Sequence, residues 1–272
     1  MKKNISFFLI LIAAGLLHSC TQSKHAATNK VYKQQVKEYA KILREYPVKD
    51  SAGLSYGTDW AGTTNFSMRK PNYVIIHHTA QNGEDETIRT FTLPRTQVSA
   101  HYVISRDGTV HHMLNDLLRA HHAGVGKWGT ITDMNSSSIG IELDNNGSEP
   151  FSDALMSSLV QLLERLKKAY NIPASNFIGH LDWAVGRKND PSRYFNWALL
   201  ASKGFGYWYE EDGTPVPDSF DALQGLRMIG YDISKPQSAI NSYRIHFTPN
   251  DTTRVLHQED RKIIFNLMRK YR

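Results

Sequence analysis

Cysteine is nearly absent from this sequence. The 272 residues include one cysteine, Cys20, so no disulfide can form within the chain. Apolar residues make up 40% of the chain and charged residues 21%, a balance that is typical of a folded globular protein and excludes a largely disordered one. The length allows one sizeable core and a small second domain.

Long apolar runs are also lacking. The apolar stretch at residues 5–17 is too short to cross a bilayer comfortably, and it follows two basic residues, Lys2 and Lys3. Because Cys20 comes directly afterwards, the segment resembles a bacterial lipoprotein signal, in which the cysteine becomes the first mature residue and carries the lipid. His18 departs from the small residue usually found there. An ordinary secretory signal with an incidental cysteine is the alternative, and both readings predict an exported protein.

Strong charge of one sign is absent too. The net charge is +6, and removal of Lys2 and Lys3 with the signal would leave +4. Such a mild basic excess does not require a nucleic-acid partner, because a solvated surface accounts for it. We therefore expect no nucleic-acid binding.

Short β-rich runs begin near residue 72. Residues 73–76 are continuously apolar, which favours a strand buried on both faces. Residues 101–105 and 109–114 flank the turn sequence Arg-Asp-Gly, which is typical of a hairpin. Two further strands are predicted at Ser138–Leu143 and at residues 176–179.

Helical patterns alternate with these strands. Leucines recur at helical spacing from Leu155 to Leu166, and Ser152 can cap this helix. Another helix is predicted at residues 31–46. Strands mixed with helices predict an α/β or α+β fold, with a central, mostly buried mixed sheet flanked by helices. After a Gly- and Pro-containing linker at 213–217, two apolar stripes predict a small C-terminal module made only of helices.

Histidine is concentrated in one region. Of the 12 histidines, seven lie between His77 and His122. His180 follows a predicted strand, and Asp190 returns after a loop that contains Gly186. A histidine and an aspartate brought together could bind zinc with His77, and this set of ligands leaves a position for water, as in catalytic zinc sites. The alternative is that Asp190 only caps or turns the chain.

Five sequence motifs occur in an order that is characteristic of one enzyme family. They are YVIIHHTA, SAHYVISRDGTVHHML, HHAG, SIGIELDN and GHLDWAVGRKNDP. Over residues 72–197 the chain resembles the type-2 zinc N-acetylmuramoyl-L-alanine amidases, which are related to the peptidoglycan-recognition proteins. It most resembles the outer-membrane lipoprotein amidases of Gram-negative bacteria. Those proteins carry a helical peptidoglycan-binding module, which the segments ALQGLRMIGYDI and IHFTP resemble.

This resemblance implies a reaction and a set of residues. The reaction is hydrolysis of the amide bond between N-acetylmuramic acid and L-alanine, in peptidoglycan or muropeptides, with zinc-bound water as the nucleophile. The ligands of one zinc ion per chain fall on His77, His180 and Asp190. Glu142 matches the acidic residue that activates the water, and Lys188 matches the basic residue that assists the tetrahedral intermediate. A carboxylate suits proton transfer and an ammonium suits oxyanion stabilisation.

The resemblance leaves alternative roles open for several other residues. The match selects His77 over His78, and adjacent strand residues face opposite sides. His101 and His122 are candidates for substrate contact or for support of the ligands, with structural packing as the alternative. Trp128 could stack on sugar or peptide, or could be a buried anchor.

The chain departs from the family pattern at three loop positions, Val185, Ser192 and Asn196. None of these positions is a ligand or an acid–base group, so the departures bear on loop shape and substrate fit more than on activity.

The predicted organisation follows from these assignments. It comprises a lipoprotein signal peptide at 1–19, a tether and N-terminal helix at 20–46, a zinc amidase domain at 47–212 and a peptidoglycan-binding-like helical module at 213–272. A lipid on Cys20 would hold the protein on a membrane, with the periplasmic side of the outer membrane as the expected location. The alternatives are a peptidoglycan-recognition lipoprotein without catalysis and a purely structural envelope lipoprotein.

Overall fold

A computed structural model describes residues 23–45, 61–210 and 212–271. The predicted signal peptide and Cys20 lie outside these residues. The chain divides into two units, Met1–Thr64 and Asn65–Arg272. The described part of the first unit is mainly helix α1 (Ala26–Arg44), which has no buried residue. In the described ranges, no helix has both the length and the apolar character that a membrane crossing requires.

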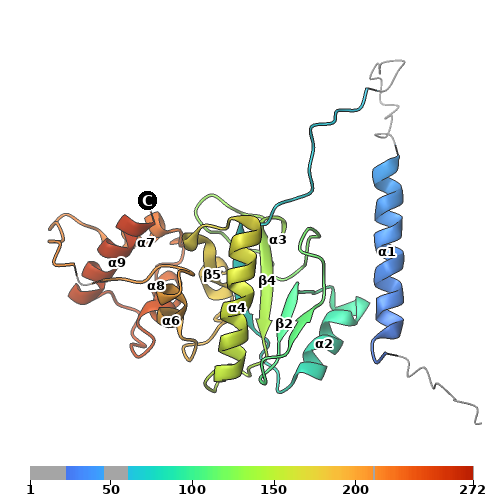
Figure 1. Ribbon diagram of the computed structural model, residues 1–272. Helices are drawn as coiled ribbons and strands as arrows, with labels where there is room; N and C mark the ends of the chain where they lie inside the picture. The colour runs from blue at the N-terminus through green and yellow to red at the C-terminus, as the bar shows by residue number, and fades with distance from the viewer. Residues whose placement is uncertain (1–22, 46–60, 211, 272) are drawn as a thin grey trace, which may run out of the picture. The chain divides into compact units, whose positions relative to one another are not determined.

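The second unit is built around one mixed sheet (Figure 1). Its strands are β1 (Tyr73–His78), β2 (Tyr102–Ile104), β3 (Val110–His112), β4 (Ser138–Leu143) and β5 (Phe177–Gly179), in the order β3-β2-β4-β1-β5. Strand β1 is parallel to both neighbours and β2 is parallel to β4, whereas β3 is antiparallel to β2.

Helices flank this sheet, so the predicted fold class is confirmed. They are α2 (Glu84–Thr92), α3 (Met134–Ser137), α4 (Asp153–Tyr170), α5 (His180–Trp183), α6 (Trp197–Ser202), α7 (Ala222–Ile229), α8 (Pro236–Phe247) and α9 (Gln258–Lys270), with 3-10 turns η1 (Pro94–Thr96) and η2 (Ala174–Asn176). In Figure 1, α6, α8 and α9 gather on the side of the sheet where β5 lies.

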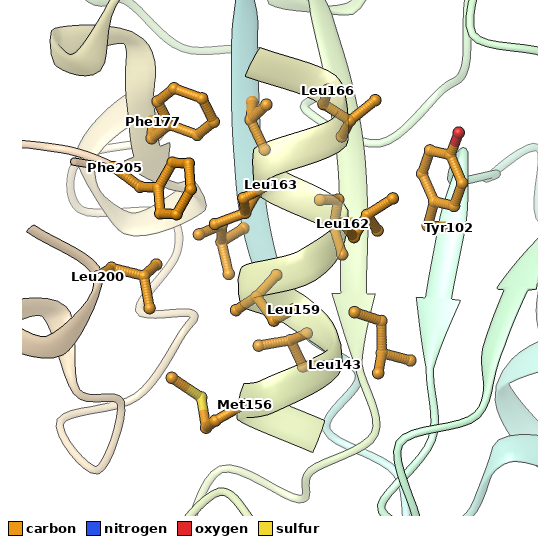
Figure 2. Packing of buried hydrophobic residues seen from close by; sticks show 14 of the residues in the cluster. Tyr102, Leu143, Met156, Leu159, Leu162, Leu163, Leu166, Phe177, Leu200 and Phe205 are labelled. Carbon is orange, nitrogen blue, oxygen red and sulfur yellow. The ribbon is translucent and has the colours of Figure 1, made fainter. Parts of the chain in front are cut away.

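Helix α4 covers one face of the sheet. Its first turn is capped by Ser152, whose hydroxyl accepts a hydrogen bond from the backbone N of Leu155 (3.2 Å). The helix turns a row of leucines toward the strands, and Figure 2 shows these side chains above β4 and beside Tyr102. Val74 and Ile76 of β1 belong to the same apolar cluster. The apolar face that the 3.6-residue period gives to α4 therefore packs against the apolar face that the two-residue alternation gives to β1.

The C-terminal helices cover part of the opposite face. Ile75 of β1 and Ile178 of β5 share an apolar cluster with Trp183 of α5, Leu226 of α7 and Ile264 of α9. The predicted boundary at residue 213 therefore lies inside one compact unit, because α7–α9 bury their apolar side chains in a core that the sheet also lines.

A substitution in α7 tests this shared core. Leu226 is fully buried, so Leu226→Ala should lower the free energy of unfolding by about 2–5 kcal/mol. The whole unit should unfold in one transition that shifts as a whole, measured by denaturant titration with both far-UV circular dichroism and tryptophan fluorescence. Met228→Ala is the control, since Met228 on the same helix is 47% exposed. Two transitions, of which only one shifts, would show that the helices fold separately.

Candidate active site

Two parallel strands bring a histidine and a glutamate side by side. His77 of β1 lies opposite Glu142 of β4 in the strand register. Because side chains alternate along a strand, both point to the face that carries Ile75, away from α4. Both side chains are buried at the carboxyl ends of their strands. The register thus positions an imidazole and a carboxyl group at one edge of the sheet.

Asp190 reaches the same edge through a backbone contact with α5. Strand β5 ends at Gly179 and α5 begins at His180. The following loop turns at Gly186, whose φ of 73° favours glycine. The backbone N of Leu181 then donates to the carbonyl oxygen of Asp190 (2.8 Å). This bond returns Asp190 to the start of α5, where its carboxylate lies beside His180.

Three potential metal ligands converge at this point. Nδ1 of His77 lies 2.9 Å from Nδ1 of His180, and Oδ2 of Asp190 lies 3.2 and 3.0 Å from these two nitrogens. All three side chains are buried. Their ligand atoms lie within 4.8 Å of one another, and no other group of this kind occurs among the residues that the structure describes.

Hydrogen bonds assign the proton on His77. The hydroxyl of Ser138 donates to the carbonyl oxygen of Met134 (2.6 Å), so its oxygen accepts from Nε2 of His122 (3.1 Å). Nδ1 of His122 then carries a lone pair and accepts from Nε2 of His77 (3.0 Å). Burial, and after it the neighbouring His180, lower the pKa of His77 to about 4. The ring is therefore neutral at pH 7, and its Nδ1 presents a lone pair to the site.

The ring of His180 is oriented in the same way. Its Nε2 lies 2.9 Å from the carbonyl oxygen of Ala123, which can only accept, so in the neutral ring that metal binding requires Nε2 carries the proton and Nδ1 presents a lone pair. With both rings neutral and protonated at Nε2, two imidazole lone pairs and the carboxylate of Asp190 face one another. A cation would stabilise such a set of acceptors. Two imidazoles and one carboxylate, each held by further hydrogen bonds, fit a catalytic zinc ion.

Glu142 is placed to exchange a proton beside this group. Oε1 lies 3.9 Å from Nδ1 of His77. Oε2 is buried and has no hydrogen-bond partner among the described residues. Burial, and then the charge of Asp190, raise the pKa of Glu142 to about 8, which the charge of Lys188 opposes. A carboxyl group with a pKa near the operating pH can both accept and donate a proton.

Lys188 lies in the loop between α5 and Asp190. Residues 186–189 of this loop are exposed, and the backbone N of Lys188 donates to the carbonyl oxygen of Ala184 (3.0 Å). The charge of Lys188 lowers the pKa values of both Glu142 and His77. The ammonium group is therefore within electrostatic reach of the buried residues from the solvent side.

His78 does not join the three ligands. Its Nδ1 accepts a hydrogen bond from the backbone N of Ser192 (3.1 Å). The side chain thus holds the segment that follows Asp190, on the other side of β1 from His77. In the structure His77, and not His78, lies with His180 and Asp190.

His101 and Trp128 are buried in the structure, which favours the packing alternative for both. The two ring nitrogens of His101 lie 3.0 Å from the backbone N of Gly140 and the carbonyl oxygen of Leu118. No part of this fully buried side chain reaches solvent. The indole of Trp128 packs against the ring of Tyr231, with centroids 5.0 Å apart. His122, by contrast, directly supports a predicted ligand.

Three supporting residues were not predicted from the sequence. Ser138 continues the hydrogen-bond chain from His122. Asn135 accepts from the backbone N atoms of His122 and Ala123 (3.1 and 2.9 Å) and so orients this segment. Gly140 leaves room for the imidazole, since a Cβ there would lie 2.4 Å from Cγ of His122. For these three, the only sequence signal was a glycine inside an apolar strand, which marks a close approach.

Comparison with known proteins finds similarity to amidases. Residues 67–193 match the family model described as N-acetylmuramoyl-L-alanine amidase. The chain is 26% identical to the N-acetylmuramoyl-L-alanine amidase AmiD of Escherichia coli K12, over 97% of this chain and 98% of that protein. It is 39% identical to the 1,6-anhydro-N-acetylmuramyl-L-alanine amidase AmpD of Haemophilus influenzae, over 39% of this chain and 58% of that protein.

Solved structures are similar as well. A complex of Escherichia coli AmiD with the substrate anhydro-N-acetylmuramic acid-L-Ala-D-gamma-Glu-L-Lys superimposes with a TM-score of 0.67 and 26% sequence identity, covering 82% of this chain and 97% of that one. AmpDh3 of Pseudomonas aeruginosa gives the same TM-score and identity, covering 80% of this chain and 99% of that one. Both similarities extend well beyond the residues that the family model matches.

Substitution of the converging residues tests the metal assignment. We expect about one zinc per chain by elemental analysis of the purified protein. His77→Ala, His180→Ala and Asp190→Ala should each lose most of it, because each removes a ligand atom. His78→Ala is the matched control and should retain zinc. If His78→Ala lost the metal and His77→Ala kept it, the assignment of the first ligand would be wrong.

Proposed function

We propose that this chain, whose residues 67–193 match the N-acetylmuramoyl-L-alanine amidase family model, is a zinc-dependent enzyme acting on muropeptides or peptidoglycan. The bond cleaved is the amide between N-acetylmuramic acid and L-alanine. The observation that carries the zinc dependence is the convergence of Nδ1 of His77, Nδ1 of His180 and Oδ2 of Asp190 at distances of 2.9 to 3.2 Å.

In this proposal, the metal ligands, Glu142 and Lys188 each contribute a different part of the reaction. Zinc held by His77, His180 and Asp190 would supply Lewis acidity, which lowers the pKa of water and polarises the scissile carbonyl group. Glu142 accepts a proton from the attacking water at its unpartnered Oε2 and passes it to the leaving nitrogen as the C–N bond breaks. The ammonium of Lys188 stabilises the negative charge that develops on the carbonyl oxygen.

The substrate class rests on the relatives. The AmiD structure that resembles this chain is a complex with an anhydro-muropeptide, and the similarity covers almost all of that protein. We therefore propose a muropeptide carrying an L-Ala-initiated stem peptide as the substrate. Residues 186–189, directly before Asp190, are exposed, so a substrate bound at the site could contact this loop.

Product analysis tests the reaction. Purified protein incubated with muropeptides should release free stem peptides that begin with L-alanine, identified by mass spectrometry. Glu142→Gln and Lys188→Ala should retain zinc, while activity falls by about 10²-fold or more, because they remove proton transfer and oxyanion stabilisation. Glu164→Gln on the exposed side of α4 is the control for the loss of a carboxylate. Wild-type protein that binds muropeptides but releases no peptide would instead indicate a recognition protein without catalysis.

We further propose that Cys20 carries a lipid that anchors the protein to the cell envelope, on the periplasmic side of the outer membrane. The support is the sequence pattern around Cys20: two basic residues, a short apolar run, and then the only cysteine of the chain. Each buried methylene of an acyl chain contributes about 0.8 kcal/mol, so several chains hold a protein firmly on a membrane.

A single substitution separates the anchor from an ordinary secretory signal. Cys20→Ser should move the protein from the membrane pellet to the soluble fraction, or leave it as an uncleaved precursor. The wild-type protein should incorporate labelled fatty acid, which the variant cannot. A soluble wild-type protein without label would favour a secreted amidase.

A further inference from the structure

A buried carboxylate lies in the helix that carries one of the proposed ligands. Asp182 follows His180 by two residues in α5 and is completely buried. Its Oδ2 accepts from the backbone N of Gly179 (2.8 Å), which closes the first turn of the helix. A charged group without solvent needs further hydrogen bonds to be tolerated, so the groups that supply them control the position of α5.

Those further bonds come from the C-terminal helices. The hydroxyl of Tyr231, just after α7, donates to Oδ1 of Asp182 (2.7 Å), and Nδ1 of His246 in α8 donates to Oδ2 (2.8 Å). The hydroxyl of Ser242, also in α8, donates to the carbonyl oxygen of Leu181 (2.8 Å). All of these side chains are buried. Helix α5 is thus bound by donors that lie about 50 to 65 residues further along the chain.

Aromatic packing holds the two donors in place. The ring of His246 stacks on Trp197, with centroids 4.0 Å apart and planes at 15°. Tyr231 packs edge-on against Trp128 at 5.0 Å. Gly230 permits this contact, because a Cβ there would lie 2.5 Å from the Trp128 ring. Each donor is therefore fixed by a neighbour that is itself buried, and the bonds to Asp182 are not loose surface contacts.

We propose that Tyr231, His246 and Asp182 form a clamp that positions His180 for metal binding, so that the C-terminal helices complete the metal site. This inference rests on the proposed zinc enzyme. Metal sites tolerate ligand displacements of only about 0.2 Å, and His180 begins the short helix that the clamp holds. Tyr231 and His246 belong to the two segments that resemble a wall-binding module, yet their polar atoms face α5.

The test removes one hydroxyl from the clamp in the full chain. Tyr231→Phe should weaken zinc binding by about 10-fold or more, the range seen when support of a ligand is lost, measured by competition with a chelator. It should also lower kcat more than it raises KM, because the remainder of the substrate site is unchanged. Tyr243→Phe is the matched control: Tyr243 is equally buried, and its hydroxyl donates to the carboxylate of Asp260 in α9 (3.0 Å) rather than to α5. Both variants should lose similar thermal stability, but zinc affinity should fall only in the first.

A second pair of variants tests His246. His246→Leu removes the donor and should reproduce the loss of zinc affinity, whereas His246→Asn retains a donor near the position of Nδ1 and should restore most of it. Amide hydrogen exchange at residues 179–184 gives a readout that needs no metal, and it should quicken in Tyr231→Phe but not in Tyr243→Phe.

The outcomes separate the clamp from the proposed function. Equal zinc affinity and equal exchange in Tyr231→Phe and Tyr243→Phe would overturn the clamp while leaving the enzyme intact. A wild-type protein without zinc affinity would overturn both the proposed zinc dependence and the metal-positioning role of the clamp, and the exchange measurement would still show whether the bonds to Asp182 hold α5.

Discussion

Nδ1 of His77, Nδ1 of His180 and Oδ2 of Asp190 lie within 3.2 Å of one another in the interior of the protein. This is the constraint on which the remainder of the site depends. In the neutral rings, the lone pairs of His77 and His180 and the carboxylate of Asp190 repel one another unless a cation lies between them. Each of these residues therefore needs hydrogen bonds to other parts of the chain to stay in position. Much of the surrounding structure serves that purpose.

The support comes from separate parts of the chain. His122 and Ser138 hold the ring of His77 by a chain of hydrogen bonds that ends on a backbone carbonyl. Ala123 holds His180, and Leu181 returns Asp190 to the start of α5. Each bond ends on a group whose donor or acceptor role is unambiguous. These bonds fix the orientation of the three candidate ligands.

Burial also acts on Glu142, the proposed proton carrier. Glu142 lies on the strand next to His77, and burial raises its pKa to about 8. Lys188 approaches from an exposed loop and so can meet a substrate.

The sequence by itself determined the elements and the ligand candidates. Period-2 and period-3.6 patterns located β1, β4 and α4, and the ordered motifs indicated His77, His180, Asp190, Glu142 and Lys188. Only the tertiary structure decided which side chains support them. The bonds of His122 to His77 and of Tyr231 and His246 to Asp182 join residues 45 to 64 positions apart. No local sequence pattern predicts such contacts, because they depend on how helices pack against a sheet rather than on residues that are neighbours in the sequence.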